Sequence, residues 1–146
     1  MSFFLLGRAR ILVGLGALLA LIAIPATASA KTERHFFGQN VSFTSSDTGF
    51  STVDALYNGN SDRHGTKVIG HARLTCVFTS QDRALCNGKI ELPGGTLLAN
   101  HVIVANTGAV TKVEINGGTR EFAGANGYVR TISTSDTTEN FTIVLR

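Results

Sequence analysis

Apolar and polar residues alternate with a period of two along most of the chain after residue 30. Residues 70–78 (GHARLTCVF) and 86–92 (CNGKIEL) show this most clearly, and each carries a cysteine on its apolar face. Similar segments cover 35–45, 50–58, 96–105, 109–116, 127–133 and 139–146. Such alternation is typical of β-strands that bury one face. The pattern therefore predicts about eight strands.

The connections between these segments are short and rich in turn-forming residues, such as Pro93-Gly94-Gly95 and Asn106-Thr107-Gly108. No long segment with helical periodicity follows residue 30. Short strands joined by such turns predict an all-β sandwich or barrel. A closed barrel leaves no exposed strand edge, which suits strands with few protective charges. We therefore expect a single antiparallel eight-stranded barrel, closed as in lipocalins, with one short helical turn.

The first thirty residues are predicted to be a cleaved secretory signal. Arg8 and Arg10 precede an apolar run from Ile11 to Ile24, and Ala28-Ser29-Ala30 supplies small residues for signal peptidase. A membrane anchor is the alternative, but spanning needs about 18–20 apolar residues. We therefore expect residues 31–146 to be one secreted domain without a membrane contact after cleavage.

The charge distribution gives no sign of a nucleic-acid partner. The whole chain has a net charge of +3, but Arg8 and Arg10 leave with the signal, so the mature domain is close to neutral. Its charged residues are scattered along the sequence, whereas nucleic-acid binding requires a basic patch.

The two cysteines, Cys76 and Cys86, are predicted to form a disulfide. An even number of cysteines in an exported chain favours this pairing. The segment TCVFTSQDRALC is symmetric about Gln81, so a hairpin that turns there sets the cysteines opposite each other. A catalytic thiol is the alternative, and it would need one unpaired cysteine beside a base.

Residues 115–130, INGGTREFAGANGYVR, contain four glycines. A phosphate-binding loop would need a Gly-Lys-Ser/Thr sequence or a glycine fingerprint that opens a long helix, and neither is present. The glycines instead indicate a tight connection between two strands. We expect Thr119 to cap one helical turn over residues 120–123, and Phe122 to plug the end of the barrel.

The same stretch resembles the G-G-T-G-x-[FY]-x-x-A-x-G signature of the dirigent and allene oxide cyclase-like barrel proteins. Arg120 stands where many members have glycine, and the sequence gives no reason for it. The order of a VIGHARLTC strand, a second cysteine, LPGG and GGT is similar to that of secreted bacterial relatives. The matching positions are Gly117, Gly118, Thr119, Phe122, Ala125 and Gly127.

This resemblance, which covers about residues 35–146, implies an eight-stranded barrel with a central cavity. It also implies a homotrimer, as in the characterised plant members. Those members bind hydrophobic oxidised intermediates and direct their cyclisation or coupling without a cofactor. The resemblance therefore implies a small hydrophobic or phenolic ligand and no cofactor for this chain.

Asp54 and His101 are the candidate catalytic residues. Asp54 lies in FSTVDALY, on the face of Thr52 and Leu56, where burial would raise the pKa of its carboxyl. His101 shares an alternating face with Leu97, Ala99, Ile103 and Ala105. For each candidate an outward-facing position is the alternative. The four histidines are too far apart in sequence to indicate a metal site: His35, His64, His71 and His101.

Three functions remain open at this point. The first is a barrel that binds a small hydrophobic or phenolic molecule and steers its cyclisation or coupling. The second is a cofactor-independent isomerase or cyclase, which would need an ionisable group inside the barrel. The third is a ligand-free structural or interaction protein of the cell exterior, with a filled interior. An open apolar interior with a few convergent polar groups would favour the first two.

Overall fold

The computed structural model describes residues 31–105, 108 and 110–146. The predicted signal segment and most of the predicted turn at 106–108 lie outside these residues. The described chain contains eight strands of six residues or more, as predicted, and two further strands of two residues each. The elements are β1 (Thr32–Ser46), β2 (Gly49–Asn60), β3 (Arg63–His64), β4 (Gly70–Phe78), β5 (Arg83–Leu92), β6 (Gly95–Ala105), β7 (Val110–Ile115), β8 (Gly117–Gly118), the 3-10 helix η1 (Arg120–Phe122), β9 (Gly127–Ser133) and β10 (Thr138–Leu145).

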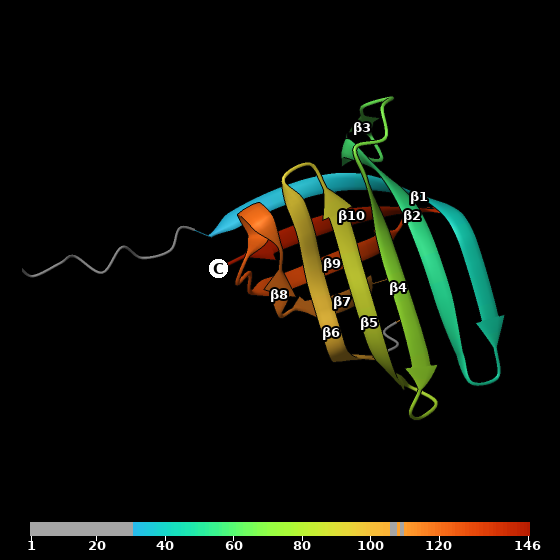
Figure 1. Cartoon of the computed structure of the whole chain (residues 1–146). Coiled ribbons are helices and arrows are strands. Elements are labelled where there is room, and N and C mark those ends of the chain that lie inside the picture. The colour runs from blue at the N-terminus through green and yellow to red at the C-terminus, as the bar shows by residue number, and fades with distance from the viewer. Residues whose placement is uncertain (1–30, 106–107, 109) are drawn as a thin grey trace, which may run out of the picture.

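The strands form an antiparallel sheet that curves into a nearly closed barrel, in the order β7-β9-β10-β1-β2-β4-β5-β6-β8 (Figure 1). The two strands at the ends of this order belong to one chain segment, because β8 follows β7 after a single residue. In that segment β7 pairs with β9 and β8 pairs with β6. Between them, Asn116 donates its backbone N–H to the Leu98 carbonyl over 3.0 Å. This segment joins the two edges of the sheet and confirms the predicted barrel.

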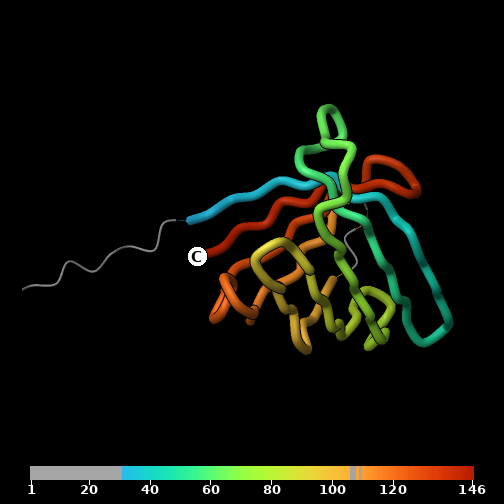
Figure 2. The backbone as a smooth tube through the Cα atoms, turned by 45° about the horizontal axis from the view of Figure 1, so that its top comes forward, coloured from blue at the N-terminus to red at the C-terminus, as the bar shows by residue number. Residues whose placement is uncertain are grey.

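One half of the barrel interior is packed with large apolar side chains. Phe122 of η1 is 6% exposed and belongs to this cluster, so it plugs the barrel as expected. We call this half the closed half; η1 lies at the same end of the molecule as the C-terminus, whereas the β1–β2 hairpin extends away from that end (Figure 2). The other buried members of the closed half are Phe36, Leu56, Ala72, Ile90, Leu97, Ile115, Val129, Phe141 and Ile143.

The second interior cluster, which we call the open half, consists of smaller side chains. It contains the disulfide between Cys76 and Cys86, which are 2% and 0% exposed. The two residues are direct partners in the β4–β5 ladder, so the predicted pairing and its place on the inner face are confirmed. The remaining buried members are Ala84, Ala99, Val102, Val104 and Val113.

Two bulges change which residues face the interior. The β1–β2 register shifts between Asn40 and Ser42, and the β5–β6 register shifts between Cys86 and Gly88. The second shift lies opposite His101, whose φ is 53°. After it, Val102 and Val104 are buried and Ile103 is 55% exposed. The alternation that groups His101 with Leu97, Ala99, Ile103 and Ala105 therefore holds only as far as Ala99. Beyond it, a bulge inserts a residue and reverses the alternation.

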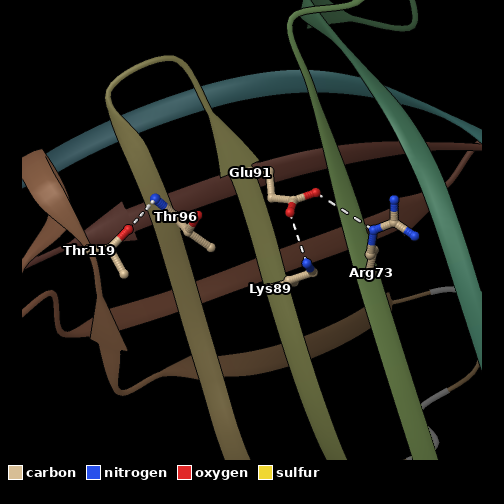
Figure 3. A network of polar contacts seen from close by, with 5 residues as sticks. All are labelled: Arg73, Lys89, Glu91, Thr96 and Thr119. Atoms are coloured by element: carbon tan, nitrogen blue, oxygen red, sulfur yellow. Dashed lines mark hydrogen bonds and ion pairs between the residues drawn. The ribbon is translucent and has the colours of Figure 1, made fainter.

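The glycine-rich connection forms the predicted single turn, with one difference at its start. Thr119 occupies the N-cap position, but its side chain makes no capping hydrogen bond. Its hydroxyl instead accepts the backbone N–H of Thr96 over 3.1 Å, which ties η1 to β6 (Figure 3). The prediction of a Thr119 side-chain cap is therefore wrong, because β6 supplies a competing donor.

The backbone of this turn explains the position of Arg120. Arg120 has a φ of 53°, in the left-handed region that glycine enters without steric cost. The signature that this stretch resembles has glycine there. In this chain an arginine adopts the left-handed conformation, which favours glycine. Gly127, the last glycine of the motif, has a φ of 158°, and a Cβ on it would overlap the Val144 carbonyl oxygen.

Candidate functional site

The open half of the barrel contains a cavity of about 690 Å³. This volume lies within the range of about 300–1,000 Å³ that is typical of small-molecule sites. The open half leaves space because its buried side chains are mainly alanine and valine. The cavity also reaches the closed half, whose residues Ala72, Ile90, Leu97, Ile115, Val129 and Phe141 belong to its wall.

Asp54 lies in the wall of this cavity and is only 3% exposed. The β1–β2 ladder places Asn40 directly opposite it. The Asn40 side-chain amide donates to Asp54 Oδ1 over 3.2 Å, and the Thr52 hydroxyl donates to Oδ2 over 3.3 Å. Burial raises the pKa of the Asp54 carboxyl, although these two hydrogen bonds favour the charged form and lower it.

Glu139 is a second acidic side chain in the cavity wall. It lies on β10, which pairs with the side of β1 opposite to β2. Burial raises the pKa of Glu139, the negative charge of Asp54 raises it further, and a hydrogen bond from Thr131 lowers it. The two carboxyls are therefore close enough to influence each other, and we call them the carboxyl pair.

The carboxyl pair has the chemistry of an acid and a base in one site. Ionising both carboxyls places two negative charges in a poorly solvated wall, which is costly. Carboxyls that interact strongly lose their protons in two separate steps, and between these steps such a pair holds one proton. In that state one member can donate a proton while the other accepts one.

Three phenylalanines line the outer part of the cavity. Phe50 lies between the other two, with its ring centroid 6.2 Å from that of Phe43 and 6.0 Å from that of Phe78. Phe43 is 61% exposed and Phe78 is 44% exposed. We call these residues the aromatic rim. An exposed aromatic group at the edge of an apolar cavity is a feature of binding sites.

The basic residues Arg73 and Lys89 are engaged with Glu91 in an exposed network across β4 and β5 (Figure 3). Lys89 Nζ lies 2.8 Å from Glu91 Oε1, and Arg73 Nε lies 3.6 Å from Glu91 Oε2. The hydrogen bond from Lys89 is the main cause of the lowered pKa of Glu91. Arg73 and Lys89 are thus engaged with Glu91 and not with the carboxyl pair.

The structure separates the two candidate catalytic residues. Asp54 faces the cavity, as its alternation with Thr52 and Leu56 predicts. His101 is exposed in the β6 bulge, where its backbone N–H donates to Asn87 Oδ1 over 2.9 Å, and it is not among the residues of the cavity wall. The bulge that reverses the alternation of β6 carries His101 outward.

Sequence reasoning missed Glu139, although a signal was present. In the alternating segment 139–146, Phe141, Ile143 and Leu145 share one face. Extending this face by two residues toward the N-terminus reaches Glu139, which lies on the inner surface. A carboxyl in register with buried apolar residues was therefore the sign of a second site residue.

The described residues contain no group of three histidine, cysteine, aspartate or glutamate side chains that could hold a metal ion. Within the same residues, no helix is long and apolar enough to cross a membrane.

Comparisons with known proteins identify the fold. No family model matches the chain, and no curated protein sequence is significantly similar to it. Among solved structures, a pyocyanin demethylase superimposes with a TM-score of 0.60 and 17% identity, over 79% of this chain and 100% of that one. The pterocarpan synthase dirigent protein GePTS1 gives a TM-score of 0.56 and 20% identity, over 80% of this chain and 87% of that one.

A second pterocarpan synthase dirigent protein, PsPTS1, gives a TM-score of 0.54 and 14% identity, over 80% of this chain and 95% of that one. These matches show that the chain has a dirigent-like barrel fold. At such low identities they show the fold alone.

Proposed function

We propose that this chain is an exported barrel protein that binds a small hydrophobic or phenolic molecule in its open half. We further propose that the carboxyl pair steers an isomerisation or cyclisation of that molecule without a cofactor. The observation that carries the proposal is the cavity of about 690 Å³ with Asp54 and Glu139 in its wall. The names of the similar proteins, a pyocyanin demethylase and two pterocarpan synthases, also refer to reactions of small molecules.

The proposed chemistry is a proton transfer in two directions. The protonated member of the pair donates its proton to one atom of the ligand, and the ionised member removes a proton from another. The ligand changes its bonding and keeps its composition, and the pair again holds one proton in total. No oxidant or reductant is consumed, so the reaction class is an isomerisation or an intramolecular cyclisation.

The ligand-free alternative is less well supported. A structural barrel needs a filled interior, whereas this barrel contains a cavity of about 690 Å³. The cavity is lined by apolar residues of both halves and contains ionisable groups. Burying carboxyls beside an empty space costs stability, and a stability cost within a cavity is typical of a functional site.

Export remains a proposal that rests on two features. The disulfide between Cys76 and Cys86 is typical of proteins from oxidising compartments. The first thirty residues have the layout of a secretory signal. Edman sequencing of the mature protein from the culture medium of an expressing host tests this, with lysine 31 expected as the first residue.

The binding proposal is tested by blocking the cavity. Leu74 lines the cavity on β4, whereas Val77 on the same strand is 58% exposed. Leu74→Trp should weaken binding of the neutral fluorophore N-phenyl-1-naphthylamine about tenfold or more, because the indole occupies the open half. Val77→Trp is the matched control and should bind as the wild type does. Equal binding by all three proteins would place the fluorophore elsewhere and overturn the proposal.

A further inference from the structure

No basic side chain among the described residues lies close enough to the two carboxyls of the cavity wall to affect the pKa of either. Burial and hydrogen bonds to neutral side chains account for the pKa of Asp54, and no basic group contributes. The pKa of Glu139 depends on burial, on Asp54 and on Thr131. Asp54 is thus buried and Glu139 half-buried, and neither has a lysine, arginine or histidine partner among residues 31–105, 108 and 110–146.

The side chains that face the pair from the surrounding strands are uncharged. Asn40 comes from β1, Thr52 from β2, Ala72 from β4, Thr131 from β9 and Phe141 from β10. The other charged residues of the cavity wall are Arg73, Lys89, Arg83 and Asp136. Arg73 and Lys89 contact Glu91, and Arg83 and Asp136 are exposed. The charge of the pair is therefore available to a ligand.

We infer that the cavity selects planar aromatic molecules that carry one positive charge on a nitrogen with N–H donors. This inference rests on the proposed binding function and names the ligand class of that site. The carboxyl pair sets the charge, the aromatic rim sets the planarity, and the cavity volume sets the size.

The charge preference follows from the acidity of the pair. Each carboxyl that loses its proton places a negative charge in the cavity wall, and a positive charge on the ligand offsets it. Hydrogen bonds between a protonated nitrogen and a carboxylate are among the stronger ones in proteins. A neutral ligand of the same shape gains the same apolar burial but leaves the negative charge unbalanced.

The preference for a planar ring follows from the aromatic rim. Phe43, Phe50 and Phe78 form a row of rings along the outer part of the cavity. Aromatic faces attract flat rings by stacking and attract cations through their π-electrons. A planar cation can therefore interact with the rim as it enters and with the carboxyl pair when it is bound.

The test compares two probes of the same shape. 2-Naphthylmethylamine is protonated at neutral pH, and 2-naphthylmethanol is its neutral counterpart. Isothermal titration calorimetry of the mature protein at pH 7 should show the amine binding about tenfold or more tightly than the alcohol. The preference should decline as the pH falls and the pair becomes fully protonated.

Two double variants of equal net charge test whether the preference for the amine comes from the carboxyl pair. Asp54→Asn with Glu139→Gln removes the carboxyl pair and should reduce the preference for the amine to less than about twofold, with binding of the alcohol retained. Asp62→Asn with Glu114→Gln removes the same charge from exposed positions and should keep the full preference.

The outcomes distinguish this inference from the proposed function. If both probes bind the wild type equally, the cavity binds small molecules but does not select cations, and the inference is overturned alone. If neither probe binds, the proposed function and the inference both fail. If the amine preference persists without the pair, the positive charge is recognised elsewhere and the inference is wrong.

Discussion

The two halves of this barrel are built from the same strands but contain different side chains. In the closed half, β-strand alternation brings phenylalanine, leucine and isoleucine inward, and Phe122 covers the end. In the open half the same strands supply alanine, valine, a disulfide and the carboxyl pair. The comparison teaches that the plug of the closed half and the aromatic rim of the cavity have different roles, so Phe122 should matter mainly for stability and Phe43 mainly for ligand binding.

The largest expected effect comes from removing the plug of the closed half. Phe122→Ala should lower the free energy of unfolding by about 3–5 kcal/mol, because Phe122 is 6% exposed. Phe43→Ala in the aromatic rim should cost less than about 1 kcal/mol, because Phe43 is 61% exposed. Urea denaturation measures both values.

The two variants should rank in the opposite order when probe binding is measured instead of stability. Phe43→Ala is expected to weaken binding of N-phenyl-1-naphthylamine, while folded Phe122→Ala should bind it normally. If Phe122→Ala loses binding and Phe43→Ala does not, the two halves do not have the separate roles described here.

The second largest effect concerns the disulfide of the open half. Its loop of about eleven residues should contribute roughly 2–3 kcal/mol to stability. The double variant Cys76→Ser with Cys86→Ser should therefore unfold at a lower urea concentration than the oxidised protein. It should also bind the probe more weakly, because the bond joins β4 and β5, which both contribute residues to the cavity wall. Dithiothreitol should lower the stability and the probe affinity of the wild type but not those of the double variant. An equal loss in the double variant would mean that reduction of the disulfide is not the cause.

A smaller change is expected at Arg120, in the turn that closes the barrel. Arg120→Gly should raise the free energy of unfolding by roughly 0.5–1 kcal/mol, because its φ of 53° is unfavourable for arginine. Ala123→Gly is the control, since Ala123 has a φ of −55°. Glycine there should lower stability, because it increases the conformational entropy of the unfolded chain. A loss of stability in Arg120→Gly would mean that the arginine side chain contributes more than its backbone costs.

The smallest expected effect is the pH dependence of stability. The folded pKa values of Asp54 and Glu139 are raised above 3.8 and 4.5, so above these values the folded state binds more protons than the unfolded state. Stability therefore falls as the pH rises toward the folded values. Glu139→Gln should be more stable than the wild type at pH 7 and equally stable at pH 3, as measured by thermal unfolding.

Glu91→Gln provides a control of opposite sign, because the pKa of Glu91 is lowered. Removing the Glu91 carboxyl should not raise the stability at pH 7. A stabilisation of the same size in both variants would reflect the loss of net charge and would remove the support for a buried pair.

The sequence was informative wherever alternation is regular and less so where a bulge interrupts it. The spacing of Cys76 and Cys86 about Gln81 predicted both the hairpin and the bond. Asp54 was correctly assigned to the face of Leu56 because β2 keeps a regular alternation there. His101 was misplaced because the β6 bulge depends on its pairing with β5, which the sequence of β6 does not contain.

The cavity itself could not be predicted from local patterns. Its volume depends on which small residues from distant strands meet, such as Ala84 of β5, Ala99 of β6 and Val113 of β7. The coupling of Asp54 with Glu139 likewise depends on β1 lying between β2 and β10. These features arise from the barrel closure, which brings together residues far apart in the chain.

The central claim is that the barrel cavity has two interacting carboxyls, Asp54 and Glu139, in its wall and that a ligand in the cavity contacts them. Carbon-13 NMR of side-chain carboxyls, recorded against pH with and without 2-naphthylmethanol, tests it most directly. We predict titration midpoints above the ordinary values for Asp54 and Glu139, and shifts of both signals on addition of the probe. Glu114, which is exposed on the outer surface, should remain unchanged by the probe. Ordinary midpoints for Asp54 and Glu139, or probe-induced shifts at Glu114 only, would contradict the account.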